Sequence, residues 1–404
     1  MSDRRPKDRF HELKERVFHR LEADPHMDDA GLRAVIDDMV FTVRPDGYVS
    51  TEERIRLADR LFHAFRGLDV LQPLVDDPAV TEVMINGPRD IFVEKGNGIE
   101  RADVEIESEE KLFDLIQLMV GKVNRAVNEA NPIVDARLPD GSRVHVVLPP
   151  VALGGPTVTI RKFPANPYTL DQLIRLGLMG EDAGDLLRRL VRARYNLFIA
   201  GGTGSGKTTL LNALAQHIDP AERIITIEDS AELKIRGIAN LVGLETRNAN
   251  AEGKGKIDMR DLIRASLRMR PDRIIVGEVR GPEAYDMLQA MNTGHEGSLS
   301  TGHGNSVKDM LYRLETMVLL AVQIPLEAVR RQICSALDVI IHLSKHRDGV
   351  RRVGEISELV DLENGEIRLN PLFLLERTPS GKMLLEPTGN PMKRGGKLAK
   401  AGLA

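Results

Sequence analysis

Apolar residues recur every three or four positions between residues 8 and 70, a spacing that is typical of helices packed along one face. Two such runs are Leu13, Val17 and Leu21, and then Leu32, Val35, Ile36, Met39 and Val40. The stretch Ser50-Thr51-Glu52-Glu53 has the form of a capping box and predicts the start of a third helix. Residues 1–70 therefore predict a bundle of three helices, although the pattern does not indicate its role.

Near Pro78 the pattern changes to short apolar runs that are separated by turn residues. The runs predict strands at residues 80–85, 91–94, 144–148 and 158–160, and a further extended stretch that ends at Ile106. One helical run, carrying Leu112 and Val120, interrupts them. Residues 71–163 therefore predict a small α+β domain. A linker at 164–168, which contains Pro164 and Pro167, follows it.

From residue 169 onward, apolar strands alternate with helices, which predicts a mostly parallel sheet in an α/β domain over residues 169–390. Thr169-Leu170-Asp171-Gln172 predicts the capping box of its first helix. The expected strands are 197–200, 224–227, 274–276, 298–301 and 339–343, with a hairpin over 356–369. Residues 391–404 are rich in Gly and Lys and predict a flexible tail.

The most specific motif is Gly201-Gly202-Thr203-Gly204-Ser205-Gly206-Lys207-Thr208, which directly follows the first of these strands. It matches the phosphate-binding loop G-x-x-x-x-G-K-[ST] in its required place between a strand and a helix. Glycines let backbone N–H groups turn inward, and a helix N-terminus adds partial positive charge. Lys207 can reach the β- and γ-phosphates, and the Thr208 hydroxyl can bind Mg²⁺. We therefore predict nucleotide binding by residues 201–208 and Thr209; the alternative is a glycine-rich turn that binds nothing.

Further polar residues follow the other predicted strands. Ligands of open parallel sheets bind beyond the carboxyl ends of the strands, so these residues should converge on the phosphates. Glu228 follows strand 224–227 and is the expected general base; Glu278 follows strand 274–276 and is the expected metal ligand together with Thr208. His303 follows strand 298–301, and with His295 just upstream it is expected to line a γ-phosphate sensor.

Each assignment has an alternative without a catalytic role. Asp229, beside Glu228, could cap a following helix, and both histidines could be ordinary loop residues. Gly277 stands where many nucleotide hydrolases carry the aspartate that contacts the metal, and Asp272 lies at the wrong end of its strand. This departure moves the expected metal role onto Glu278.

The smaller domain supplies three candidate arginines, Arg137, Arg143 and Arg161. The first two flank the turn at Pro139-Asp140-Gly141, and the third lies just before the linker. Guanidinium groups stabilise the charge that develops during phosphoryl transfer. The alternative is that all three are ordinary surface arginines.

Composition narrows the class of protein further. Hydrophobic content of 42% and charged content of 29% are typical of a soluble globular protein. The net charge of −4 and the 15 aromatic residues (10 Phe, 5 Tyr, no Trp) offer no obvious nucleic-acid groove. No apolar stretch approaches the roughly 20 residues of a membrane-spanning helix, and the charged first residues do not form a secretory signal. We therefore expect a cytoplasmic protein, in which the single Cys334 is a small core residue.

The order of these motifs resembles the Walker A, Asp box, Walker B and His box of the secretion ATPase superfamily of type II and type IV secretion systems and type IV pili. The segments that carry the resemblance are residues 201–208, 225–229, 274–281 and 293–303. Gly277 in place of an aspartate is usual for that superfamily. Residues 131–144 and 313–318 look closest to the CpaF/TadA branch, which drives assembly of tight-adherence (Flp) pili. The resemblance covers about residues 70–375.

The resemblance implies a cytoplasmic homohexamer in which a RecA-like motor domain and a PAS-like smaller domain bind ATP and Mg²⁺ between them. Hydrolysis would then act on an inner-membrane platform protein, with no nucleic acid as partner. By motif, Glu228 matches the Asp-box glutamate and Glu278 the Walker B glutamate; His295 and His303 match the His box. Arg137, Arg143 and Arg161 match the arginines of the smaller domain. The four-cysteine zinc module of many type II members is missing, because the chain has one cysteine.

Three other functions compete with a pilus-assembly ATPase. The nearest is a type IV secretion motor that exports protein or DNA. The second is an ATP-binding scaffold with negligible turnover, which the intact Glu228 and Glu278 disfavour. The third is a RecA-like nucleic-acid motor, which the net charge and the aromatic content disfavour.

Overall fold

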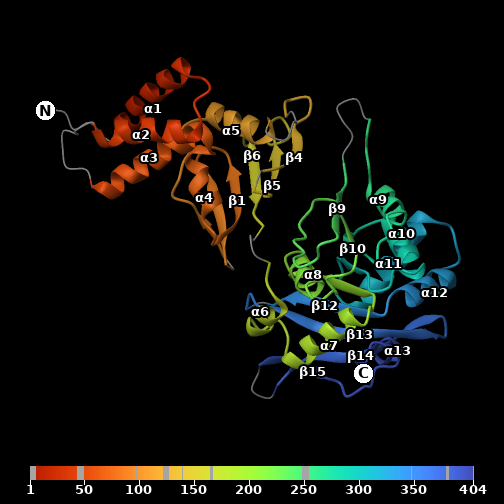
Figure 1. The fold of residues 1–404 in the computed structure, drawn as a ribbon. Coiled ribbons are helices and arrows are strands. Elements are labelled where there is room, and N and C mark those ends of the chain that lie inside the picture. The colour runs from red at the N-terminus through yellow and green to blue at the C-terminus, as the bar shows by residue number, and fades with distance from the viewer. Residues whose placement is uncertain are drawn as a thin grey trace. The chain divides into compact units, whose positions relative to one another are not determined.

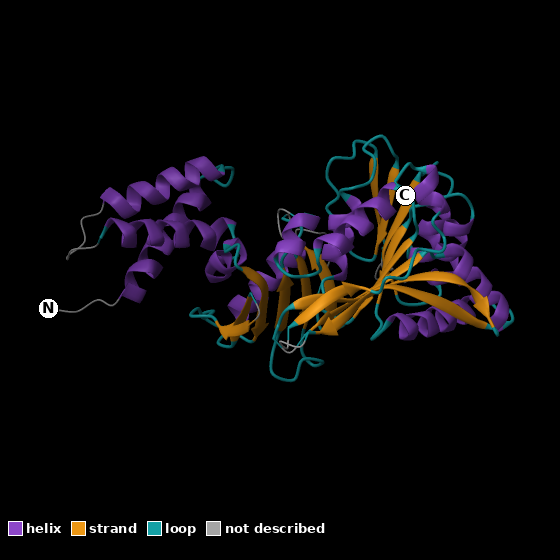
Figure 2. Ribbon diagram, turned by 90° about the horizontal axis from the view of Figure 1, so that it is seen from below, coloured by secondary structure: helices purple, strands orange, loops and turns teal. Residues whose placement is uncertain are grey.

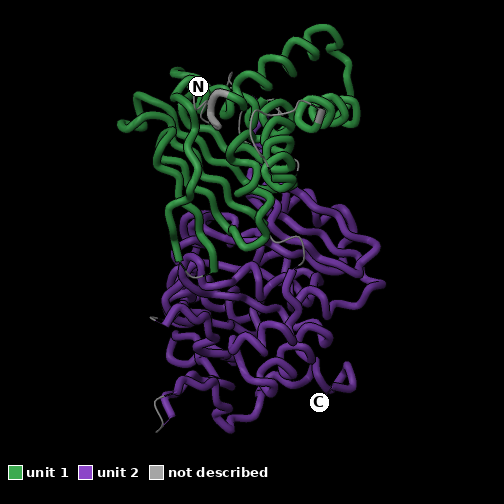
Figure 3. Tube along the Cα trace, turned by 90° about the vertical axis from the view of Figure 1, so that its left-hand side faces the viewer, with its two compact units in different colours: residues 1–165 green, residues 166–404 purple. Residues whose placement is uncertain are grey.

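The computed structural model describes residues 6–42, 50–96, 98–121, 127–138, 140–163, 167–247, 254–346, 348–378 and 382–403. The chain divides into two compact units, residues 1–165 and residues 166–404 (Figure 3). Within the described residues, no helix has both the length and the apolar character needed to cross a bilayer.

The first unit begins with three helices, α1 (Pro6–Ala23), α2 (Asp29–Thr42) and α3 (Thr51–Arg66) (Figure 1). Their apolar faces meet in a small core of their own, which includes Val17, Ile36 and Leu61. The predicted capping box is confirmed: Glu53 N donates to Ser50 Oγ (3.2 Å) while Ser50 N donates to Glu53 Oε2 (2.9 Å). The three predicted helices are thus present.

The rest of this unit is an antiparallel sheet covered by a helix. Its elements are η1 (Asp69–Leu71), α4 (Gln72–Asp76), β1 (Val80–Asn86), β2 (Ile91–Lys95), β3 (Gly98–Arg101), α5 (Glu109–Gly121), β4 (Ile133–Arg137), β5 (Arg143–Val147) and β6 (Thr157–Arg161). The strand order is β3-β2-β1-β6-β5-β4, and α5 packs its apolar face on the sheet. Two strands differ from the prediction: β3 ends at Arg101 and does not reach Ile106, and the sequence did not predict β4. The PAS-like character of this sheet stays a prediction.

The second unit contains a sheet of nine strands flanked by helices. Its elements are α6 (Leu170–Arg175), α7 (Glu181–Arg192), β7 (Leu197–Gly201), α8 (Lys207–Ala215), β8 (Ile224–Glu228), β9 (Leu241–Glu245), α9 (Met259–Ser266), β10 (Arg273–Val279), α10 (Glu283–Asn292), β11 (Leu299–Gly302), α11 (Val307–Ala321), α12 (Leu326–Ala336), β12 (Val339–Lys345), β13 (Arg351–Glu363), β14 (Glu366–Arg377), β15 (Met383–Pro387) and α13 (Gly396–Lys400). The strand order is β15-β14-β13-β12-β7-β11-β10-β8-β9. Strands β12 to β9 in this order run parallel, and β13 to β15 are antiparallel additions.

Helices cover both faces of the parallel part of this sheet, as the secondary-structure colours of Figure 2 help to follow. One core contains side chains of α6, α7, α8 and α13, and the other contains side chains of α9 to α12. All five residues of β7 are buried, as expected for a central parallel strand with both faces covered. The predicted α/β class and the parallel sheet are confirmed, and the capping box at Thr169 and Gln172 is present.

The prediction of a flexible tail from residue 391 is wrong for the described residues up to 403. Leu398 is buried in the core beside α7, and Lys397 Nζ donates to Asp338 Oδ2 (2.8 Å). The backbone N–H of Arg394 donates to the buried Glu358 Oε1 (2.5 Å), and its guanidinium donates to Leu337 O (3.2 Å). A few well-placed side chains hold the segment, which its Gly- and Lys-rich composition did not reveal. Residues 164–166 of the predicted linker lie outside the described residues.

Candidate nucleotide site

The phosphate loop lies at the carboxyl end of β7, between β12 and β11. At its first position, a Cβ added to Gly201 would lie 2.5 Å from the Leu343 carbonyl oxygen of β12, so only glycine fits. Gly204 (φ +69°) and Gly206 (φ +96°) adopt the left-handed conformation that glycine takes at little cost. The backbone that the motif predicts is therefore formed, and α8 begins at Lys207 directly after it.

Lys207 points back into the loop. Its Nζ donates to the carbonyl oxygens of Gly201 (3.2 Å) and Gly202 (3.0 Å), and lies 3.5 Å from His303 Nδ1. The Ser205 hydroxyl is buried and has no hydrogen-bond partner in the described structure. A buried ammonium group and an unpaired hydroxyl inside a glycine loop are polar groups that bound phosphate oxygens would satisfy. The residues present therefore fit a nucleotide triphosphate.

Glu278 and His303 meet at the same edge of the sheet. Glu278 Oε1 lies 2.6 Å from His303 Nε2, and its Oε2 accepts a hydrogen bond from the Arg280 guanidinium (2.7 Å). His303 thus stands between the phosphate-loop lysine and the Glu278 carboxylate. The convergence expected from the strand ends is observed for these three residues. A Thr208 hydroxyl and the Glu278 carboxylate are oxygen donors of the kind that Mg²⁺ prefers, so the donor chemistry fits this ion.

The charges around this edge shift several pKa values. Burial lowers the pKa of His303, and the nearby Lys207 and Arg280 lower it further, which together outweigh the opposite effect of Glu278. Burial raises the pKa of Asp229, with Glu283 and Glu278 adding to the rise and Arg280 opposing it. The hydrogen bond that Arg280 donates to the Glu278 carboxylate raises the pKa of Arg280. A group of carboxylates thus surrounds one guanidinium, an arrangement typical of a functional site.

Glu228 is buried beneath Gly277 of the neighbouring strand β10. Its Oε1 accepts hydrogen bonds from the backbone N–H groups of Glu232 (2.8 Å) and Leu233 (3.0 Å). A Cβ added to Gly277 would lie 2.8 Å from Glu228 Cγ. The glycine that replaces the common Walker B aspartate therefore leaves the space that the Glu228 side chain fills.

Asp229 and Asp272 are the other two acidic residues considered from the sequence near this site. No helix follows Asp229, so its expected alternative role as a helix cap is wrong. Asp272 lies at the opposite end of β10, where its Oδ2 accepts a hydrogen bond from Arg223 N (2.7 Å). The general-base role of Glu228 stays a prediction, because the described hydrogen bonds tie its Oε1 to the backbone of residues 232–233 and do not test that role.

The structure places His295 apart from the phosphate loop. His295 precedes β11, whereas His303 follows it, and β11 runs parallel to β7. His295 is therefore at the amino-terminal edge of the sheet, where its Nδ1 lies 3.1 Å from the Ala290 carbonyl oxygen at the end of α10. The structure does not bring His295 to the phosphate loop, and its place in a γ-phosphate sensor stays a prediction. The two histidines are close in sequence but separated in space, because the four residues of β11 between them span about 13 Å.

The three predicted arginines of the first unit share one register row. Arg137 is opposite Arg143 in the β4–β5 pair, and Arg143 is opposite Arg161 in the β5–β6 pair. Directly opposite residues lie on the same face of a sheet, so the guanidinium groups form a row of like charges. Arg143 is held by Asp135 (3.2 Å); burial would raise the pKa of Asp135, but hydrogen bonds from His145 and Arg143 lower it overall. Such a row would be relieved by an anionic partner, although its role stays a prediction.

Two residues of this site were not predicted from the sequence. Arg280 could have been found, because it lies two positions after Glu278 and alternate residues of an extended chain share a face. Arg351, at the start of β13, donates its Nε–H to the Gly204 carbonyl oxygen of the phosphate loop (2.8 Å). No local motif marks Arg351, since only the pairing of β12 with β13 returns it to the loop.

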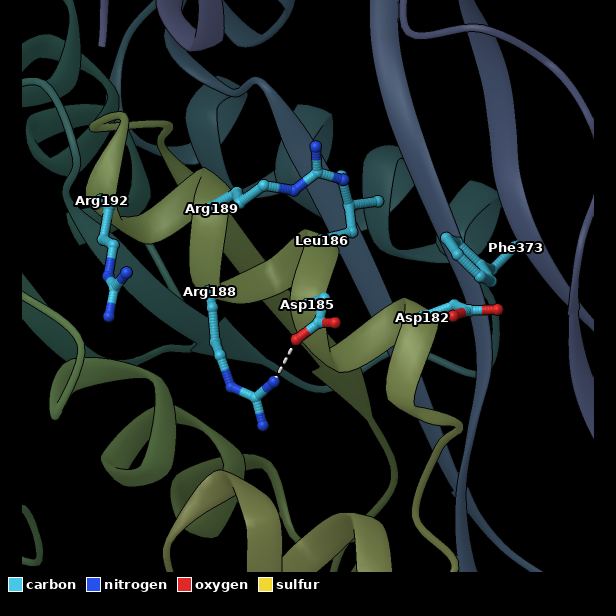
Figure 4. Close-up of a pocket in the computed structure, with 7 residues that line it drawn as sticks. All are labelled: Asp182, Asp185, Leu186, Arg188, Arg189, Arg192 and Phe373. Carbon is cyan, nitrogen blue, oxygen red and sulfur yellow. Dashed lines mark hydrogen bonds and ion pairs between the residues drawn. The ribbon is translucent and has the colours of Figure 1, made fainter. Parts of the chain in front are cut away.

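A separate pocket of about 620 Å³ opens along α7 (Figure 4). Three arginines, two aspartates, Leu186 and Phe373 line it, and Figure 4 shows Arg188 paired with Asp185. Arg188 also pairs with Asp171. No lining residue belongs to the phosphate loop, and the two aspartates offset two of the three arginines. This pocket therefore adds nothing to the nucleotide site.

Comparison with known proteins gives consistent matches. The family model described as "Type II/IV secretion system protein" matches residues 65–358. A putative conjugal transfer protein of Mycobacterium tuberculosis is 38% identical over 303 residues, which cover 74% of this chain and 86% of that protein. The type IV secretion system protein VirB11 of Brucella suis is 34% identical over 343 residues, covering 78% and 94%.

Solved structures agree on the fold. The ATPase DotB of Legionella pneumophila has a TM-score of 0.52 at 19% identity, covering 79% of this chain and 82% of that chain. The pilus retraction motor PilT, solved with bound ADP, has a TM-score of 0.52 at 20% identity, covering 83% and 87%. At these identities the likeness supports the α/β fold of such motors and nothing finer.

Proposed function

The chain belongs to the Type II/IV secretion system protein family, and we propose that it is an Mg·ATP-hydrolysing motor that powers a type IV pilus-like or secretion machine. The expected family and its ATPase class are confirmed by the family model and by the matching secretion proteins. The RecA-like character of the motor domain, the hexameric ring and the closeness to the CpaF/TadA branch belong to the proposal.

One observation carries the proposal. His303, directly after β11, lies 3.5 Å from Lys207 Nζ of the phosphate loop and 2.6 Å from the Glu278 carboxylate near the end of β10. Glu278 and His303 come at least 71 positions after Lys207 in the sequence, and the parallel sheet brings all three residues to one edge. An ammonium group for phosphate and a carboxylate for a metal, side by side, are what nucleotide hydrolysis requires.

Each residue of the site has a separate role in the proposed hydrolysis. The loop backbone and Lys207 bind and orient the triphosphate, and Thr208 and Glu278 would hold Mg²⁺. That ion would neutralise the phosphate charge. Glu228 orients or deprotonates the attacking water, and His303 donates a hydrogen bond near the γ-phosphate. Arg280, which pairs with Glu278, holds that carboxylate in place.

The arginine row of the first unit supports a role in transition-state stabilisation. Three guanidinium groups on one face of a sheet are a concentrated positive charge of the kind that phosphoryl transfer uses. We propose that Arg137, Arg143 and Arg161 act on a bound triphosphate, in the same subunit or in a neighbouring one of a homohexamer. An inner-membrane platform protein would receive the resulting motion, with the chain associated peripherally with the membrane through it.

Two machines are candidates for the work this motor does. Tight-adherence pilus assembly is favoured by residues 131–144 and 313–318, which resemble that branch. Type IV secretion is favoured by the relatives, one of which is named a putative conjugal transfer protein and another VirB11. We propose pilus assembly as the first candidate and type IV secretion as the second.

Steady-state phosphate release from the purified full-length protein tests the enzymatic proposal. We expect Mg²⁺-dependent ATP hydrolysis that Lys207→Ala abolishes. Glu228→Gln is the sharper variant: its amide oxygen still accepts both backbone hydrogen bonds, so the fold is kept while the base is lost. Equal rates for the wild type and Glu228→Gln would remove the general-base assignment, and no hydrolysis by the wild type would remove the function.

A deletion strain distinguishes the two machines. Loss of surface filaments, restored by the wild type and not by Lys207→Ala, would support pilus assembly. Loss of protein export or DNA transfer with filaments intact would support the secretion motor. Electron micrographs of the protein with a non-hydrolysable ATP analogue test the ring, and strictly monomeric particles with bound nucleotide would contradict it.

A further inference from the structure

We propose that Arg351 is a positioning residue of the phosphate loop, which it holds in the conformation that binds nucleotide. This inference rests on the proposed nucleotide function and adds to it a residue outside every motif of the sequence. Its basis is one contact: the Nε–H of Arg351 donates to the carbonyl oxygen of Gly204 at 2.8 Å.

The sheet explains why a residue about 150 positions away reaches this loop. β12 pairs in parallel with β7, and Leu343 is opposite Gly201, the last residue before the loop turns. β13 then runs back antiparallel to β12, with Arg351 opposite Lys345. The start of β13 is therefore fixed at the carboxyl edge of the sheet, where the loop lies.

The contacted carbonyl sets the direction of an N–H group. Gly204 O and Ser205 N–H belong to one trans peptide plane and point in opposite directions. Gly204 has no Cβ and a positive φ (+69°), so its own backbone does little to fix that plane. The hydrogen bond from Arg351 to this oxygen fixes the orientation of the peptide plane and therefore the direction of the Ser205 N–H. Loops of this kind bind phosphate with such backbone N–H groups.

A second contact on the same loop supports this role. The Arg351 Cδ would lie 3.5 Å from a Cβ added to Gly206, so the stem of the side chain packs against the end of the loop. Within the described part of the chain, the terminal nitrogens of Arg351 have no other partner. The guanidinium therefore also leaves a positive charge beside the loop, which favours a bound anion.

Arg352 provides a matched control in the next position. Adjacent residues of a strand point to opposite faces, and Arg352 instead forms an ion pair with Asp348 (2.8 Å). Replacing either arginine removes the same charge from the same strand. Only Arg351 contacts the phosphate loop.

The test measures the Kd for ADP, the KM for ATP and kcat for full-length wild type, Arg351→Gln, Arg351→Lys and Arg352→Gln, with melting temperatures of each. A hydrogen bond from a charged donor is worth about a tenfold change in binding, or about 1.4 kcal/mol. We therefore expect Arg351→Gln to raise Kd and KM about tenfold while kcat falls much less. Arg351→Lys, which keeps a charged donor, should recover most of the affinity, and Arg352→Gln should bind as the wild type does.

Two outcomes overturn the inference without touching the proposed function. One is a wild type that hydrolyses ATP with an Arg351→Gln variant of unchanged Kd and KM. The other is equal loss of affinity in Arg351→Gln and Arg352→Gln with no recovery in Arg351→Lys, which would mean that the hairpin as a whole supports the fold. A wild type that neither binds nor hydrolyses nucleotide overturns both.

Discussion

Gly277→Ala tests whether the glycine of the Walker B segment exists to make room for Glu228. A methyl group at this position would lie 2.8 Å from Glu228 Cγ, closer than real side chains approach. Glu228 cannot simply rotate away, because its carboxylate holds the backbone N–H groups of Glu232 and Leu233. Relief of the overlap therefore strains these hydrogen bonds or the two strands.

Overpacking of this kind costs about 1–3 kcal/mol of unfolding free energy. In a unit the size of residues 166–404, each kcal/mol corresponds to about 2–4 °C of melting temperature, so we expect Gly277→Ala to melt about 2–12 °C below the wild type. Displacement of Glu228 should also lower ATP hydrolysis. Gly277→Asp, which restores the residue common in other nucleotide hydrolases, should be worse, because it adds a carboxylate beside Glu228.

Gly243→Ala in β9, the strand that pairs with the other side of β8, is the matched control. A Cβ there would meet Thr226 Oγ1 at 3.5 Å, an ordinary contact, so the variant should melt at or above the wild-type temperature. The assay is thermal denaturation followed by fluorescence, with phosphate release measured on the same preparations. Equal melting temperatures and activities for Gly277→Ala and Gly243→Ala would refute the steric argument.

A double variant isolates the cause. Glu228→Ala removes Cγ, at a cost of about 1–3 kcal/mol for the backbone donors that lose their acceptor. With Cγ gone, adding Gly277→Ala should cost little more, so the two changes should couple by about 1–3 kcal/mol. Strictly additive effects would mean that the loss in Gly277→Ala arises elsewhere.

Three further predictions concern other parts of the molecule. Deletion of residues 391–404 should lower the melting temperature by about 3 °C or more, because the buried Leu398 side chain is lost, whereas an unchanged value would restore the flexible tail. The pKa of His303 is lowered in the folded state, so as pH falls toward its ordinary value near 6.5 the unfolded chain takes up the proton first, and the free energy of unfolding falls with pH. His303→Gln should flatten this decline between pH 7.5 and 5.5, whereas the exposed control His19→Gln should keep it. Equal slopes for the two variants would contradict the argument. Arg161→Ala should lower kcat at least about tenfold with ADP affinity unchanged. Mixing it with Lys207→Ala subunits should restore hydrolysis if the arginine acts on a neighbouring subunit, and unchanged kcat in Arg161→Ala would remove its role.

Local patterns predicted much of the fold because the decisive signals are short. The capping boxes at Ser50 and Thr169 and the phosphate loop are each determined by residues within a few positions of one another. The parallel strands followed from continuous apolar runs, since both faces of β7 and β8 are buried. β9 was not predicted, because it is an edge strand in which three residues are partly buried and two are exposed.

The sequence predicted several site residues that lie at the carboxyl ends of the parallel strands, and it missed others. Glu278 lies near the carboxyl end of β10, His303 directly follows the adjacent β11, and the two side chains meet. His295 is near His303 in sequence and at the other edge of the sheet in space. Arg351 depends on a long-range pairing that no local pattern carries. The anchoring of residues 391–403 likewise depends on a few side chains, such as Lys397, reaching partners far away in the sequence.

A structure of the protein with Mg²⁺ and a non-hydrolysable ATP analogue tests the central claim most directly. We expect Lys207 Nζ to leave the Gly201 and Gly202 carbonyl oxygens for the phosphates, with the ion at Thr208 and Glu278 and the analogue beside His303. An analogue bound elsewhere, with Lys207 still donating to those two carbonyl groups, would contradict it.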